Sequence, residues 1–169
     1  MGETGEPQAE AFWQFSLGFY AIPGVAAALL ALQDREGLDV NLALFALWFG
    51  LSGGGRLDGE ALEAADRAVR PIRTDVVEPL RALRRRLRDH PDQDVQRLRD
   101  GVKALELKGE KLMQTRLEHF AGNLRTNAPF ERRIADAHAN FALSLAPEAV
   151  RGDEARIIRE ALVALAHGQ

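Results

Sequence analysis

Residues 32–50 read LQDREGLDVNLALFALWFG and set polar side chains beside one of the most apolar runs in the chain. The apolar residues fall on every side of the helix that they predict, which is expected to run from Val40 to about Leu51. A soluble helix that is apolar on all sides belongs at the centre of a core or at a protein interface. The polar side chains around its start are Gln33, Asp34, Asp39 and Asn41.

Two further helices precede this apolar helix and complete a three-helix unit over residues 10–52. The first is rich in aromatic residues, with Phe12, Phe15 and Phe19 at spacings that share one helical face. Gly37 suits the end of the second helix, because glycine readily adopts the left-handed conformation found there. A glycine-rich segment then predicts a flexible loop after the unit.

The following part of the chain predicts charged helices over residues 58–124. The first of them is expected to end near Arg70, because Pro71 follows. A capping box of Asp75 and Glu78 predicts a new helix start. A long apolar stripe continues to about residue 124, and two glycines within it either bend the helix or admit a close neighbour. These glycines are Gly101 and Gly109.

Together these patterns predict an all-α protein, a compact single-domain bundle of about seven or eight helices. The domain is expected to span residues 10–145, after a disordered leader at residues 1–9. Residues 146–169 predict a C-terminal helix that is only weakly attached. No segment shows the two-residue alternation of a convincing β-strand.

Composition argues against several classes of protein. The 169 residues carry a net charge of −3, whereas dedicated nucleic-acid-binding domains usually present a basic surface. The absence of cysteine excludes disulfides, thiolate nucleophiles and cysteine-ligated zinc. No apolar run reaches the ~20 residues that span a bilayer, so we expect no membrane span. The start of the sequence is acidic, unlike a signal peptide, so we expect a cytoplasmic protein.

The polar cluster in residues 32–50 is the first candidate site. Asp34, Asp39 and Asn41 offer oxygen ligands of the kind that Mg²⁺ or Ca²⁺ prefers, but their spacing matches no calcium-binding loop, so no metal is expected. In a second interpretation the cluster is the polar part of a ligand pocket. In the favoured one, Gln33 and Asp34 bind backbone groups at a helix end, while Asp39 and Asn41 cap the next helix. The aromatic walls of such a pocket would be Trp13, Tyr20 and Trp48.

An arginine stripe and an acidic stripe form the second candidate site. The arginines occupy one face of a predicted helix and could bind phosphate groups. They are Arg81, Arg84, Arg85 and Arg88. On the long helix Glu106, Glu110 and Gln114 recur every four residues. Ion pairs between the first two arginines and the two glutamates account for both stripes and are the favoured interpretation.

No catalytic constellation stands out in the sequence. The four histidines are scattered without metal-ligand spacing, and no serine has the Gly-x-Ser-x-Gly surroundings of a nucleophile. We therefore predict no catalytic residue and no cofactor, and a non-enzymatic role is favoured.

Three motifs in the first fifty residues form a recognisable pattern. They are Phe-Trp-x-Phe-Ser-Leu from residue 12, Leu-Gln-Asp from residue 32, and Asp-Val-Asn-Leu-x-Leu-Phe-x-x-Trp from residue 39. The pattern resembles a family of short, uncharacterised proteobacterial proteins, known as a domain of unknown function, over about residues 11–115. The resemblance implies no activity, cofactor or catalytic residue, because the family has none assigned.

Two functions remain open at this point. The favoured one is a non-enzymatic module that binds a protein partner or associates with itself, because the apolar surface exceeds what a three-helix unit readily hides. The alternative is a small-molecule-binding protein or enzyme with its site at the turn formed by Gln33-Asp34 and Asp39-Asn41.

Overall fold

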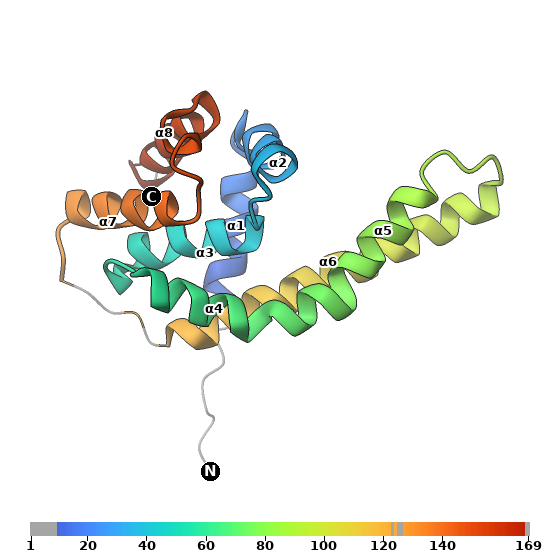
Figure 1. Cartoon of the computed structure of the whole chain (residues 1–169), viewed down its shortest axis with the longest axis horizontal. Coiled ribbons are helices and arrows are strands. Elements are labelled where there is room, and N and C mark those ends of the chain that lie inside the picture. Colours follow the sequence, from blue (N-terminus) through green and yellow to red (C-terminus); the bar gives the residue numbers. More distant parts are fainter. Residues whose placement is uncertain (1–9, 123, 125–126, 168–169) are drawn as a thin grey trace, which may run out of the picture.

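The structure is a computed structural model and describes residues 10–122, 124 and 127–167. Within these residues every regular element is a helix, so the prediction of an all-α bundle is confirmed (Figure 1). The predicted leader at residues 1–9 lies outside the described residues. The α-helices are α1 (Ala11–Tyr20), α2 (Val25–Glu36), α3 (Val40–Phe49), α4 (Gly59–Ile72), α5 (Glu78–Arg86), α6 (Gln93–Ala121), α7 (Phe130–Leu143) and α8 (Asp153–His167). Shorter helical segments are the π-type turns η1 (Gly50–Gly54) and η2 (Arg73–Val77) and the 3₁₀ turn η3 (Ala149–Arg151).

Helix α3 lies at the centre of the bundle. All seven residues from Leu42 to Trp48 are buried, and the helix contacts α1, α2, α4, α6 and α7. Its start is fixed by Asp39, whose carboxylate accepts a hydrogen bond from the backbone N–H of Leu42 at 3.0 Å. Because burial of one large apolar side chain contributes about 1.5–3 kcal/mol, this helix supplies much of the stability of the core. Its apolar surface is covered inside the chain.

Helices α4 and α5 belong to one continuous, irregular helix. The sequence-based end before Pro71 and the new start at a capping box of Asp75 and Glu78 are therefore wrong. Proline lacks a backbone N–H and crowds the preceding helical turn, and the wider π-type turn η2 directly after it keeps the backbone helical. Asp75 consequently lies inside a helical segment.

Helix α5 and the first half of α6 form an antiparallel hairpin that extends away from the bundle (Figure 1). We call this hairpin, residues 78–105, the arm. None of the α5 residues is buried. Just beyond the inner end of the arm, Gly109 of α6 admits a close neighbour, because a Cβ atom there would lie 3.0 Å from the side chain of Val77. A Cβ atom at Gly101 would meet nothing within 4 Å.

Helices α7 and α8 complete the bundle. Helix α7 packs on α3 and η1, and Gly50 permits this contact because a Cβ atom there would lie less than 3.0 Å from the backbone of Ala137. Helix α8 packs on α2. The sequence predicts only weak attachment for residues 146–169. In the structure, the described part of this segment contributes to the hydrophobic core. Its buried residues in α8 are Ala155, Ile158, Ala161 and Leu162.

None of the described helices is by itself both long and apolar enough to cross a membrane. Helices α1 and α2 reach that length and composition only when taken together, and the chain bends by 97° between them. Both helices contribute fully buried side chains to the core, among them Phe12, Phe19 and Leu29.

Candidate functional site

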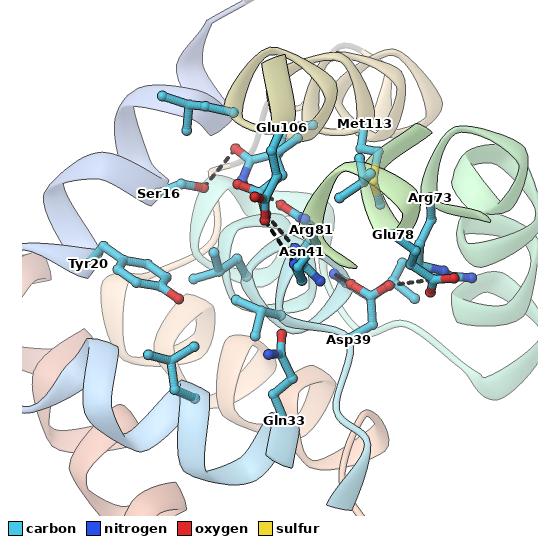
Figure 2. Close-up of a pocket in the computed structure, with 18 of the residues that line it drawn as sticks. Ser16, Tyr20, Gln33, Asp39, Asn41, Arg73, Glu78, Arg81, Glu106 and Met113 are labelled. Atoms are coloured by element: carbon cyan, nitrogen blue, oxygen red, sulfur yellow. Dashed lines mark hydrogen bonds and ion pairs between the residues drawn. The ribbon is translucent and has the colours of Figure 1, made fainter. Parts of the chain in front are cut away.

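A cleft of about 1230 Å³ lies between the N-terminal helices and the arm (Figure 2). Its walls come mainly from α1, α2 and α3 on one side and from η2, α5 and α6 on the other. The cleft exists because α1 and α3 contact α6, whereas the arm diverges from them (Figure 1).

Both candidate sites of the sequence analysis meet in this cleft. The lining residues from the polar cluster and its aromatic walls are Trp13, Tyr20, Gln33, Asp39 and Asn41. Those from the two charged stripes are Arg81, Arg84, Arg85, Glu106, Glu110 and Gln114. The first set belongs to α1, α2, α3 and the N-cap of α3, and the second to α5 and α6, so only the tertiary fold brings them together.

Three residues of the predicted sites do not line the cleft. Trp48 is 7% exposed and stacks on Phe12, with ring centroids 5.2 Å apart. Asp34 and Arg88 are exposed. The expected capping role of Asp34 and Gln33 is also wrong, because neither side chain hydrogen-bonds to a described residue and α2 ends instead at Gly37 in the left-handed conformation.

Asp39 has a structural role on both of its oxygens. One oxygen caps α3, and the other forms an ion pair with Arg73 of η2. Arg73 also contacts Asp66 of α4 at 2.5 Å. Burial opposes ionisation of Asp66, but hydrogen bonds from Arg70 and Arg73 outweigh it and hold the pKa of this carboxyl below its usual value. This network ties the start of α3 to the bent helix.

Asn41 takes part in a chain of hydrogen-bonded polar side chains rather than in capping. Its Oδ1 accepts a hydrogen bond from Nε2 of Gln114 at 2.9 Å, and the Oε1 of Gln114 accepts one from the hydroxyl of Ser16 at 2.9 Å. Gln114 is 3% exposed and Ser16 is 5% exposed. The chain therefore links α1, α6 and α3 at the base of the cleft.

The arginine and acidic stripes form an ion-pair cluster between α5 and α6. Nε of Arg81 lies 3.0 Å from Glu106, its Nη2 lies 2.6 Å from Glu110, and Arg84 also pairs with Glu106. At Glu106 burial opposes ionisation, but the hydrogen bonds from both arginines outweigh it and lower the pKa. At Glu110 burial outweighs the opposing effect of the arginines, of which only Arg81 forms an ion pair with it, and raises the pKa. Both arginines are thus already matched by carboxylates.

Four polar groups around the cleft have no hydrogen-bond partner among the described residues. They are the hydroxyl of Tyr20, the side-chain amide of Gln33, Nδ2 of Asn41 and Oε2 of Glu110. Figure 2 shows the Tyr20 hydroxyl and the Gln33 amide turned towards the space between the helices. Burial raises the pKa of Tyr20, and the charge of Glu110 adds to this effect, so the phenol keeps its proton. Four helices thus present free donors and acceptors to one space.

Apolar side chains complete the walls of the cleft. Leu17 of α1, Leu30 of α2 and Leu107 of α6 are exposed by 48%, 47% and 51%. The buried residues Leu38, Leu44 and Met113 also line the space. Acidic and basic residues along the cleft are nearly balanced, with Asp39, Asp66, Glu78, Asp100, Glu106 and Glu110 against Arg73, Arg81, Arg84, Arg85 and Lys103. Such a surface suits a ligand with an apolar body and an uncharged polar end.

Arg73 of this site was not found from the sequence. It follows Pro71 in a segment that was expected to lie between helices, so no pattern marked it. Gln114 was marked by the four-residue repeat that it shares with Glu106 and Glu110, but its contacts with Ser16 and Asn41 were not predicted. Among the described residues no group of three or more histidine, aspartate or glutamate side chains is arranged to hold a metal ion.

Comparisons with known proteins identify a family for this chain, but that family has no known function. The family described as Protein of unknown function (DUF2390) matches residues 11–117, which include α1 to α5 and most of α6. The chain belongs to this family. Comparisons with curated proteins and with solved structures find no match.

Proposed function

We propose that this member of the family binds a small amphipathic organic molecule in the cleft and holds it without converting it. The observation that supports this function is the set of free polar groups on Tyr20, Gln33, Asn41 and Glu110. Ligand sites typically combine apolar walls with a few polar groups that fix orientation, and the cleft has both.

The ligand's polar end carries both donors and acceptors and no strong charge. Donors are needed to match Oε2 of Glu110 and the carbonyl of Gln33, and acceptors to match Nδ2 of Asn41. A strongly anionic group is disfavoured, because Arg81 and Arg84 already pair with carboxylates and the acidic residues along the cleft outnumber the basic ones. The apolar body would cover Leu17, Leu30 and Leu107, which are half exposed without it.

Ligand screening with two cleft variants tests this function. Uncharged amphipathic compounds should raise the melting temperature of the wild type, and Gln33→Leu and Tyr20→Phe should each weaken their binding about threefold to tenfold, the worth of one hydrogen bond. Gln93→Leu is the matched control, because Gln93 is exposed on the arm and does not line the cleft. If no compound distinguishes the cleft variants from this control, and nothing co-purifies with the native protein, the function is refuted.

A second function, association with a protein partner, is supported by a leucine stripe on α6. Leu98, Leu105 and Leu112 are 62%, 52% and 45% exposed and recur every seven residues, which places them on one face of the helix. Lys108 lies beside this stripe along the helix and forms no ion pair with a described residue, whereas Lys111 already pairs with Glu10. We therefore propose that the stripe binds an apolar helix flanked by acidic residues, since a second copy of α6 would bring like charges together.

Crosslinking from the stripe tests this association. A photo-crosslinking amino acid at position 105 should capture a partner with an acidic amphipathic helix, whereas the same amino acid at Gln93 should not. A product with twice the mass of the chain would show self-association instead and would contradict the acidic-partner proposal. A cytoplasmic location and a bacterial origin stay predictions beside both functions.

A further inference from the structure

A second, smaller pocket lies on another part of the bundle. Its volume is about 460 Å³, and it is formed by α1, the junction of α3 and η1, the first turn of α7 and the end of α8. The apolar side chains with large surfaces around it are Phe15, Trp48, Leu51, Phe130 and Leu165. None of its lining residues belongs to the cleft described above.

Among the described residues, Arg133 is the one charged residue that lines this pocket. Its Nη1 donates a hydrogen bond to the backbone oxygen of Leu51 at 3.1 Å, and its guanidinium carbon lies 5.9 Å from the ring centre of Phe130. No carboxylate among the described residues forms an ion pair with it, in contrast to its neighbour Arg132, which pairs with Asp136.

Two nitrogens of the Arg133 guanidinium group, Nε and Nη2, have no hydrogen-bond partner among the described residues. Nε of Arg133 is buried and has no hydrogen-bond partner, and within the described chain it is the one buried side-chain nitrogen or oxygen in that state. Nη2 has no partner among the described residues either. Because surrounding atoms cover Nε, a ligand oxygen has no room beside it, and Nη2 is the nitrogen that can donate to a molecule in the pocket. Arg133 thus offers a positive charge that no described carboxylate matches, beside apolar walls.

We propose that this pocket binds an organic monocarboxylate with an aromatic or aliphatic body. One arginine supplies one positive charge, which matches a single carboxylate, and the apolar walls match the body. A phosphate group or a dicarboxylate would place a second negative charge against Phe15, Trp48 and Phe130. No second arginine or lysine among the described lining residues could neutralise that charge. The volume lies in the range of pockets that hold small ligands.

Fluorine NMR with a matched pair of probes tests this site. The acid 4-fluorophenylacetate should show line broadening with the full chain at millimolar concentration, and its amide should bind at least about tenfold more weakly, because it lacks the charge that Arg133 receives. Arg133→Met keeps the apolar stem and removes the guanidinium group, so it should abolish the difference between acid and amide. Arg151→Met is the control, since Arg151 is an exposed arginine outside the pocket.

A second variant keeps the test decisive if Arg133→Met fails to fold. Gly18 lines the pocket, and a Cβ atom there would meet nothing within 4 Å, so Gly18→Leu should fill the pocket and leave the helix intact. We expect this variant to lose the acid while keeping Arg133. Equal binding of acid and amide by the wild type, no binding of the acid, or unchanged binding by Gly18→Leu would overturn the proposal.

Discussion

Nε of Arg81 lies 3.0 Å from a carboxylate oxygen of Glu106, and this ion pair joins α5 to α6 where the arm leaves the bundle. Glu106 is 5% exposed, so its charge depends on the arginines around it. None of the α5 residues is fully buried, and these ion pairs are among the contacts that hold the helix against α6.

Arg81→Ala should lower the free energy of unfolding by about 1–3 kcal/mol. The substitution leaves Glu106 with Arg84 alone and Glu110 without a partner, and an unmatched buried charge is costly. Arg88→Ala should change the stability by less than about 0.5 kcal/mol, because Arg88 is exposed and forms no ion pair with a described residue. Urea unfolding of the two variants measures the difference, and equal losses would show that the cluster does not hold the arm.

Asp39→Ala should cost about 1–3 kcal/mol in urea unfolding. The variant loses the cap on Leu42 and the ion pair with Arg73 together. Asp34→Ala is the matched control and should stay within about 0.5 kcal/mol, because Asp34 is exposed and its side chain forms no hydrogen bond or ion pair with a described residue. A larger loss at Asp34 than at Asp39 would contradict the roles assigned here.

Local sequence patterns predicted individual helices better than they predicted how the helices pack together. The all-round apolar pattern from Leu42 to Trp48 predicted a helix either at the centre of a core or at a protein interface, and α3 lies in the core. Pro71 misled the prediction, because the π-type turn η2 that accommodates it has no signature in local propensity. Whether α8 is attached depends on its packing against α2, and the sequence of α8 alone does not contain that information.

In the candidate site, too, the sequence predicted a contact between neighbouring residues but missed a contact between residues far apart in the chain. Asp39 was predicted as a cap because the N-cap position depends only on neighbouring backbone groups. The expected cap at Asn41 is instead a contact with Gln114, which is 73 residues further along the chain. The cleft, which unites the polar cluster with the charged stripes, arises from contacts of this kind and could not be read from spacing.

Glu106 and Glu110 should respond to pH in opposite ways. Against the effect of burial, hydrogen bonds from Arg84 and Arg81 hold the pKa of Glu106 below 4.5, whereas burial raises that of Glu110 above 4.5. Ionised Glu106 therefore stabilises the fold above pH 4.5, and this contribution is lost as the pH falls through its lowered pKa. Protonated Glu110 is favoured in the fold, and that contribution is lost as the pH rises through its raised pKa.

Glutamine variants separate the two glutamates in urea unfolding between pH 3 and pH 7. At pH 7, Glu106→Gln should have a lower free energy of unfolding than the wild type. Between pH 7 and pH 3, its free energy of unfolding should fall by less than that of the wild type. Glu110→Gln resembles the protonated residue, so at pH 7 it should cost less than Glu106→Gln and stay within about 1 kcal/mol of the wild type. Parallel pH profiles for both variants would show that the opposite pKa shifts do not contribute to stability.

Gly50→Ala should destabilise the protein by more than about 2 kcal/mol, although alanine is the better helix former. A Cβ atom at Gly50 would lie less than 3.0 Å from the backbone of Ala137, which cannot move without separating α7 from α3. Gly101→Ala should instead stabilise the chain by about 0.5–1 kcal/mol, because its Cβ atom would meet nothing within 4 Å and alanine restricts the unfolded state. Thermal and urea unfolding of both variants measures the contrast. Gains of equal size at the two positions would mean that α3 and α7 do not approach as closely as the structure shows.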